Sequence, residues 1–241
     1  YCVFLNAVAK KSDPCRLYNS SMSSALHGGI LRTGNAGAYA YTAKSGMGNY
    51  PVVYVSWFDA ARYVNWLSNG SPNGLQDKTT TEDGAYALNG AVSGVSIVRN
   101  AINPNTKLKP TKWLLNESEW FTSAYLKSSD STSVSLWNYP TQSDTQPDLK
   151  LTNPKNLANY GNIFDGPTEV GFFSDSPSAF GTFDQGGNVR EWTESVDATK
   201  YRIIRGGSWA DSADAMKASE SDVADPTLED DKTGFRIGGA P

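Results

Sequence analysis

The sequence predicts an α+β fold of irregular, loop-rich architecture, and three observations support this class. Two strongly patterned helices each follow a short apolar run, at residues 51–70 and 112–127. Brief strand-like segments and glycine-rich turns are scattered along the rest of the chain. Aromatic residues make up 12% of the sequence, including 7 tryptophans, and they supply large side chains for a core.

The first expected element is a short helix, because apolar residues between positions 3 and 8 recur at helical spacing. Pro14 ends this unit, since proline cannot continue a helix interior. A Ser- and Gly-rich stretch follows over residues 18–50. Within it GAYAYTAKSG, residues 37–46, alternates as an exposed hairpin strand does.

The clearest helix signal lies in PVVYVSWFDAARYVNWLSNG, residues 51–70. An apolar, strand-like run ends at Ser56, which is a good N-cap residue, and Asp59 stands three positions later as a capping-box partner. Asn69 and Gly70 supply the stop signal. A strand followed by a helix is therefore expected here.

The same arrangement returns in KWLLNESEWFTSAYLK, residues 112–127, where Asn116 is the expected cap and Glu119 its partner. Residues 71–110 form a polar excursion between the two units, with DGAYALNG at 83–90 as a predicted hairpin. We expect these two helices to be the most regular elements of the chain.

The chain is expected to form a single domain over residues 1–241. Residues 128–183 are rich in Pro, Asn, Ser and Asp and are predicted to be mostly loop. Helices and loops alternate throughout, and no clean linker divides the sequence. Long ordered loops cost conformational entropy, so they tend to need disulfides, buried tryptophans or bound metal ions.

The composition excludes several classes of function. The net charge of −4 and pI near 5.1 argue against a nucleic-acid partner, which demands a basic surface. No apolar run approaches the roughly 20 residues of a membrane span. Only 19% of residues are charged, while Gly, Ser, Thr and Asn abound, which suits an exported protein. The abrupt start YCVFLNAVA indicates a mature or trimmed chain.

Cys2 and Cys15 are the only cysteines, and we predict a disulfide between them. They flank one helix–loop unit, and closing a loop of this size would stabilise the fold by roughly 3 kcal/mol. The alternative is two buried thiols in a cytosolic protein. A structural zinc site needs four Cys or His ligands. With His27 as the only histidine, the chain cannot easily supply them.

Five motifs, PVVYVSWFDAARYVNWLS, LLNESEW, FGTFDQGGNVREWTES, RIIRGGSW and TGFRI, follow one another along nearly the whole chain. In order and spacing they resemble the formylglycine-generating enzyme, or sulfatase-modifying factor, domain family. The resemblance implies a fold related to C-type lectin-like domains and a secreted bacterial subgroup. The family usually begins with a strand that ends in a tyrosine. Tyr1 matches that final residue, so the N-terminal strand is expected to be missing.

The resemblance also implies calcium. In this family the GNVxEW turn is a calcium loop, with carboxylate and carbonyl oxygens that suit a hard cation. The alternative is that the acids form an internal pair with arginine and cap a turn. Of the motif arginines, Arg205 or Arg236 is expected in an internal pair. The matching ligand positions are Asp184, Gly187, Val189 and Glu191, with Asn159 and then Asp165 at a second, less secure site.

The catalytic residues of the family are missing. Its enzymes hold copper with two cysteines at fixed spacing after RGGSW, and this chain has Asp211 and Met216 there. Copper(I) prefers thiolate ligands, so copper-dependent oxidation is not expected. A related branch holds iron with three histidines, and one histidine excludes that site. His27 also lacks the surrounding pattern of a Ser–His–Asp triad.

The expected function is therefore a non-catalytic extracellular or cell-surface module, for binding or structure, stabilised by calcium and without copper or iron. Its partner would be a protein or glycan at the cell surface, or a second copy of the chain. An enzyme of unrecognised mechanism and a ligand-binding variable protein remain as alternatives. The acid-rich segment, residues 210–233, is the expected binding face, although its acids could simply keep the surface soluble. Its acids include Asp211, Asp214, Glu229, Asp230 and Asp231.

Overall fold

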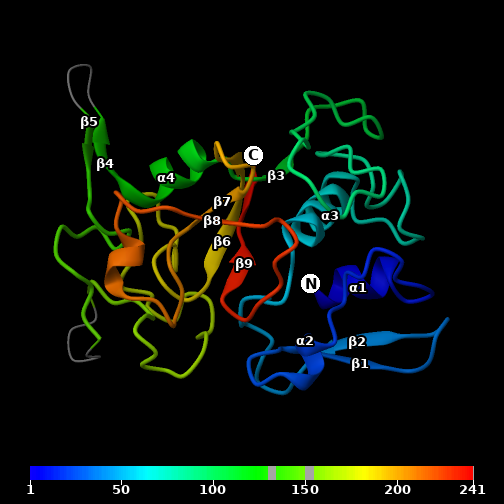
Figure 1. The fold of residues 1–241 in the computed structure, drawn as a ribbon, viewed down its shortest axis with the longest axis horizontal. Helices are drawn as coiled ribbons and strands as arrows, with labels where there is room; N and C mark the ends of the chain where they lie inside the picture. Colours follow the sequence, from blue (N-terminus) through cyan, green and yellow to red (C-terminus); the bar gives the residue numbers. More distant parts are fainter. Residues whose placement is uncertain (130–133, 150–154, 241) are drawn as a thin grey trace.

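A four-stranded sheet lies at the centre of the molecule, in the strand order β8-β7-β6-β9 (Figure 1). The computed structural model describes residues 1–129, 134–149 and 155–240. Strand β9 runs parallel to β6, and the other pairs in this sheet are antiparallel. The mixture of helix and sheet confirms the predicted α+β class. The sheet strands are β6 Arg190–Val196, β7 Arg202–Arg205, β8 Asp222–Ala224 and β9 Thr233–Phe235.

The remaining strands form three two-stranded antiparallel pairs. The helices are short, and the predicted N-terminal helix is present as α1. The pairs are β1 Ile30–Thr33 with β2 Ala40–Ala43, β3 Lys112–Leu114 with β10 Ile237–Gly239, and β4 Leu126–Ser129 with β5 Val134–Leu136. The helices are α1 Cys2–Val8, α2 Ser21–Ser24, α3 Trp57–Ser68 and α4 Glu117–Tyr125, with a 3₁₀ turn η1 at Ala213–Met216.

Both predicted capping boxes are confirmed. The Ser56 hydroxyl accepts a hydrogen bond from the Asp59 N–H, and the Asp59 carboxylate accepts one from the Ser56 N–H. Asn116 and Glu119 make the same reciprocal pair at the start of α4. Each box supplies hydrogen-bond acceptors for two backbone N–H groups that the start of a helix otherwise leaves unpaired. The two boxes therefore fix where α3 and α4 begin.

Two local predictions are wrong. Residues 51–55 form no strand: Tyr54 has a positive φ of 60°, and its N–H bonds to Asp230 O instead of to a neighbouring strand. The segment 83–90 is a turn with one bridge to Arg99 rather than a hairpin. The described residues of the region 128–183 are mostly loop, as predicted, apart from the end of β4 and the short strand β5 that pairs with it.

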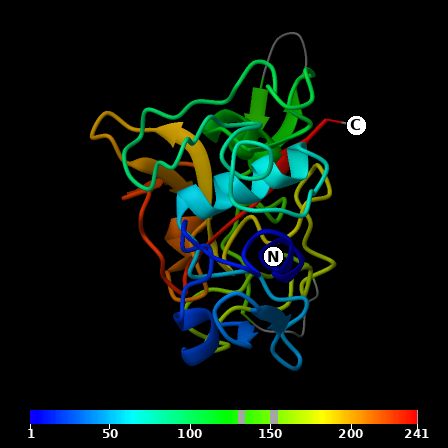
Figure 2. The same ribbon diagram turned by 90° about the vertical axis from the view of Figure 1, so that its right-hand side faces the viewer.

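The hydrophobic core has two main parts, joined at α3. One cluster lies beneath α1 and the β1–β2 hairpin, which the two views place at the same end of the molecule (Figures 1 and 2). The other surrounds Trp57 and Trp192, both fully buried. The Trp57 indole N–H donates to Thr193 O, and the Trp192 indole donates to Val55 O, each at 3.0 Å. These bonds fasten α3 to strand β6.

Among the described residues, no helix is long and apolar enough to cross a membrane.

Candidate functional site

The glycines of the DQGGNV and RGGSW motifs let two backbone turns pack directly against each other. Gly187 N–H donates to Gly206 O at 2.8 Å, and Trp209 N–H donates to Asn188 O at 2.8 Å. Gly187 has a φ of +75°, and a Cβ there would lie 2.2 Å from Asn159 O. The glycines therefore serve close backbone approach, which positions the residues on either side of them.

Glu191 projects from the start of β6 into a buried ion pair. Its Oε1 lies 2.8 Å from Arg236 Nη2, and its Oε2 lies 2.9 Å from Arg236 Nε. The Trp120 indole N–H also donates to Glu191 Oε2, at 2.6 Å. Although burial opposes it, the Glu191 carboxylate raises the pKa of Arg236 above its usual range. Both carboxylate oxygens therefore already have strong partners within the protein.

Asp184, the other predicted calcium acid, is half-buried and lines the same hollow as Glu191. Its Oδ2 accepts a hydrogen bond from Gly171 N–H at 2.5 Å, and burial raises its pKa. Across the part of the chain that the structure describes, no three His, Cys, Asp or Glu side chains gather into a group that could hold a metal ion. For Glu191, this geometry matches the alternative to calcium binding, which was an internal pair with an arginine.

Asn159 stands out among the predicted ligands. It is 1% exposed, and its Nδ2 donates to Gly166 O at 2.9 Å. Its Oδ1 has no hydrogen-bond partner among the described residues, which is costly for a buried carbonyl oxygen. Asn159 thus offers one free oxygen that a calcium ion could use. The Glu191 oxygens, in contrast, already bind Arg236. Val189 is buried, and its side chain packs near Gly234.

The structure corrects the predicted disulfide, because Cys2 and Cys15 are both free thiols with different surroundings. The Cys15 thiol lies 3.5 Å from Glu82 Oε1, which also binds the buried Arg62. Burial raises the pKa of Cys15 to about 11. Cys2 instead faces an apolar cavity beside Met22. Each thiol is therefore held in its own environment.

Alkylation of the unfolded chain without reductant is expected to label both cysteines, because neither is oxidised in the fold. In the native protein Cys15 should react slowly, since its raised pKa keeps it as the thiol rather than the reactive thiolate. Mass spectrometry after iodoacetamide treatment checks both statements. Labelling that appears only after reduction would restore the disulfide.

At the positions where the enzymes that this chain resembles carry copper-binding cysteines, both side chains already make other contacts. Asp211 Oδ2 accepts hydrogen bonds from Ser208 N at 2.9 Å and Ser208 Oγ at 2.7 Å. Met216 is fully buried in a cluster with Tyr139 and Tyr160. Asp211 thus braces the turn after RGGSW, while Met216 is part of the core.

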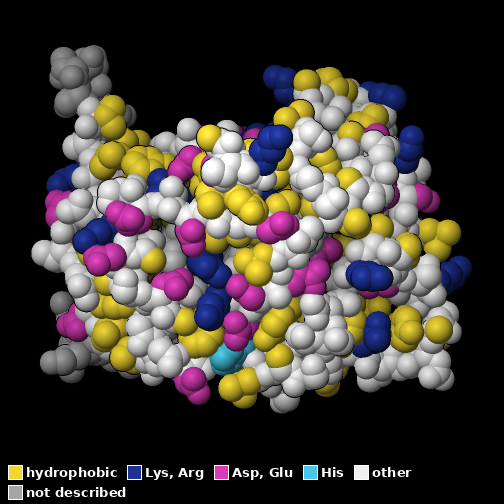
Figure 3. Space-filling view, in the orientation of Figure 1, with side chains coloured by type: hydrophobic (Ala, Val, Ile, Leu, Met, Phe, Trp, Pro, Cys, Tyr) yellow, Lys and Arg dark blue, Asp and Glu magenta, His cyan; other side chains and the backbone are white. Residues whose placement is uncertain are grey.

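The acid-rich segment is only partly available for binding. Figure 3 shows acidic side chains gathered across the middle of one face, with basic groups among them. Asp214 forms an exposed pair with Lys217 at 2.5 Å, and Asp211 is used as described above. The remaining predicted acids are tied inward: Glu229 to Asn19, Asp230 to Arg190 at 2.9 Å and Asp231 to His27 at 2.9 Å. The exposed acids of the segment are Asp214, Glu220, Asp222 and Asp225.

His27 acts as a structural tie. Its Nδ1 lies 2.9 Å from Asp231 Oδ2, and its Nε2 lies 2.7 Å from Asp165 O. Its ring also packs edge-on against Trp209, with centroids 4.7 Å apart. Both ring nitrogens are occupied, and neither faces a serine hydroxyl. His27 therefore joins three loops instead of serving a Ser–His–Asp triad.

Sequence reasoning missed a small cavity of about 230 Å³ that adjoins the acid-rich segment. Two arginines line it together with Asp211 and exposed acids. Arg205 is 5% exposed and its guanidinium lies 5.2 Å from the Phe121 ring centroid, while its Nε stands 3.5 Å from Glu117. Arg190 was not predicted, and its place between two acidic loops has no local sequence signal. The cavity thus mixes basic and acidic groups.

Comparisons with known proteins show the family and the fold of this chain. The family model described as the sulfatase-modifying factor enzyme 1-like domain matches residues 21–238. Among solved structures, Treponema denticola variable protein 1 is similar at 23% identity, with a TM-score of 0.55, over 83% of this chain and 75% of that chain. At this identity the likeness shows the fold alone.

Two further structures are more distant. CarF is 18% identical over 89% of this chain and 76% of its own, and PvdO from Pseudomonas aeruginosa is 19% identical over 86% of this chain and 67% of its own. Both have a TM-score of 0.48. No match was found among curated proteins.

Proposed function

This chain belongs to the sulfatase-modifying factor enzyme 1-like domain family, and we propose that it uses the family's scaffold for binding rather than for copper-dependent oxidation. In this proposal it is an extracellular or cell-surface bacterial module. Its partner is a protein or glycan at that surface, or a second copy of the chain.

One observation carries the proposal. The positions where the resembling enzymes place two copper-binding cysteines hold Asp211 and Met216, and neither side chain supplies a thiolate. Asp211 accepts a hydrogen bond from the Ser208 hydroxyl, and Met216 is packed in the core. The scaffold around these positions is retained, so a role that needs the scaffold without the thiols fits best.

The exposed acids supply the binding chemistry. Asp214 and Asp222 keep 71% and 68% of their side-chain exposure, and Glu220 is also exposed. Glu220 and Asp222 line the cavity that contains Arg190 and Arg205. Exposed acids of this kind favour a cationic partner, and salt weakens such attraction by screening. The inward acids Glu229, Asp230 and Asp231 hold the loop that presents them.

We include structural calcium in the proposal, at Asn159 rather than at Glu191. The buried Asn159 Oδ1 lacks a hydrogen-bond partner among the described residues, and a hard cation binds such a carbonyl oxygen. A bound ion that recognises only the folded state would raise the melting temperature. Total metal analysis separates this proposal from an enzyme of unrecognised mechanism, which stoichiometric copper or iron would support.

Charge reversal at Glu220→Lys with Asp222→Lys is expected to weaken binding of an octalysine peptide by roughly tenfold at low salt, because two attractions become repulsions. The matched control reverses two exposed acids elsewhere, Glu169→Lys with Asp175→Lys, and keeps the same net charge change. Isothermal titration measures the affinity, and light scattering measures self-association. Equal losses in both variants would mean that the segment is only a solvated surface.

A further inference from the structure

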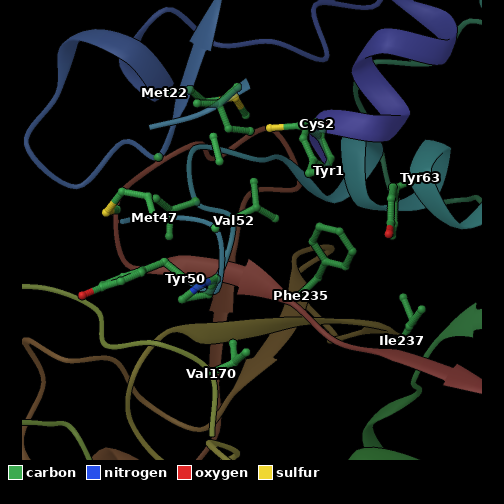
Figure 4. A pocket seen from close by; sticks show the side chains of 16 residues that line it. Tyr1, Cys2, Met22, Met47, Tyr50, Val52, Tyr63, Val170, Phe235 and Ile237 are labelled. Atoms are coloured by element: carbon green, nitrogen blue, oxygen red, sulfur yellow. The ribbon is translucent and has the colours of Figure 1, made fainter. Parts of the chain in front are cut away.

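An apolar cavity of about 570 Å³ lies between α1, α3, the β1–β2 hairpin and the end of β9 (Figure 4). Ile30 from β1, Ala43 from β2 and Tyr63 from α3 are among its walls. None of the 16 described residues that line it has an acidic or basic side chain. The volume falls within the roughly 300–1,000 Å³ of small-molecule sites. The walls therefore select an uncharged, apolar group.

The shape and composition of this cavity favour a hydrocarbon chain. Figure 4 shows Val52 near Phe235 in the middle of the cavity, with Cys2 and Met22 beyond them and Val170 on the opposite side. Methionine side chains adapt to flexible apolar ligands. A peptide here would bury backbone N–H and C=O groups, each of which costs free energy without a partner. A hydrocarbon chain carries no such groups.

A second hollow of about 430 Å³ adjoins the first, and charged residues are among those that line it. Glu191 and Arg236 line it, but they neutralise each other. Asp184 also lines it, and has no ion-pair partner within 4.0 Å in the described parts of the chain. The two hollows share four lining residues, Pro51, Val52, Val170 and Phe235.

The boundary between the hollows is fixed by two neighbouring peptide groups. Val170 N–H donates to Asn49 O at 2.8 Å, and Gly171 N–H donates to Asp184 Oδ2 at 2.5 Å. The second bond orients the Asp184 carboxylate at the polar end of the groove. An unpaired carboxylate beside an apolar cavity is complementary to a ligand with a positive head and an apolar tail.

We propose that the two hollows form one amphipathic groove that binds a single-chain cationic amphiphile. Its hydrocarbon tail lies beside Phe235, and its ammonium head pairs with Asp184. The groove is separate from the exposed acids of residues 210–233, so it does not depend on the binding role proposed for them.

The test is a series of unbranched alkylamines, from hexylamine to decylamine, titrated calorimetrically in a chelator buffer so that calcium does not compete for Asp184. Each added methylene that enters the cavity should tighten the dissociation constant by up to about fourfold, as expected for about 0.8 kcal/mol per buried methylene. The alkanoic acid of equal length should bind at least roughly tenfold more weakly, because its head repels Asp184.

Two variants separate the tail site from the head site. Gly48 lines the cavity, and a Cβ there meets no heavy atom within 4 Å, so Gly48→Leu adds an apolar side chain at the cavity wall. It should abolish the chain-length gain, while Gly48→Ala should preserve most of it. Asp184→Asn keeps an acceptor for Gly171 N–H and should remove the preference for amine over acid, with the chain-length gain retained.

Near-ultraviolet circular dichroism shows whether each variant keeps the native fold. The proposal is overturned if no alkylamine binds saturably, if affinity does not depend on chain length, or if folded Gly48→Leu retains the full gain. Equal binding of amine and acid by the unaltered protein would overturn the role of Asp184.

Discussion

Replacing Glu191 with alanine is expected to lower the free energy of unfolding by about 3 kcal/mol, because it leaves a largely buried charge without its partner. Arg236 donates to Glu191 through Nε and Nη2, and Trp120 donates through its indole N–H. All three donors lose the carboxylate together, although Arg236 Nη2 keeps its hydrogen bond to Phe183 O. The loss should be at the low end for buried pairs, since the Arg236 side chain keeps 24% of its exposure. Urea unfolding measures it.

Three comparisons sharpen this prediction. Glu191→Gln keeps an acceptor for Trp120 and should cost less than alanine, whereas Glu169→Ala, at an exposed acid, should change stability by less than about 0.5 kcal/mol. The Glu191→Ala loss should be the same in calcium and in chelator, and any calcium-dependent rise in the melting temperature should survive the substitution. A loss that disappears in chelator would instead make Glu191 a calcium ligand.

The capped helices could be predicted because their signals are local. Ser56 with Asp59, and Asn116 with Glu119, are reciprocal partners only three residues apart, so the sequence contains the whole interaction. The strand predicted at residues 51–55 is absent because a strand forms only where a neighbouring strand pairs with it. A continuous apolar run cannot show that Tyr54 takes a positive φ and bonds to Asp230, far along the chain.

The site was harder to predict, for the same reason. Family resemblance indicated the right motif at Glu191, yet its partner Arg236 lies 45 residues away, and their contact takes up the oxygens assigned to calcium. The free thiols follow from separate surroundings that sequence spacing does not reveal. The amphipathic groove draws its walls from many distant segments, so no periodic pattern marks it. Interactions between distant segments decided each of these outcomes.

Gly187→Ala is expected to lower the free energy of unfolding by about 3 kcal/mol or more, from two separate causes. An alanine at the φ of +75° costs about 1–2 kcal/mol, since the left-handed region brings Cβ close to the backbone. Its Cβ would also lie 2.2 Å from Asn159 O, and relieving that overlap by a backbone shift costs about 1–3 kcal/mol. The shift would strain the hydrogen bond from Asn188 N–H to Asn159 O.

Gly181→Ala is the matched control, because Gly181 has nearly the same φ, +73°, but no heavy atom within 4 Å of its Cβ position. It should show the backbone cost alone, about 1–2 kcal/mol. The difference between the two variants in urea unfolding therefore isolates the contact between the DQGGNV turn and Asn159. Equal losses would show that the turn tolerates a side chain at Gly187, and close backbone packing would then not explain the paired glycines of this motif.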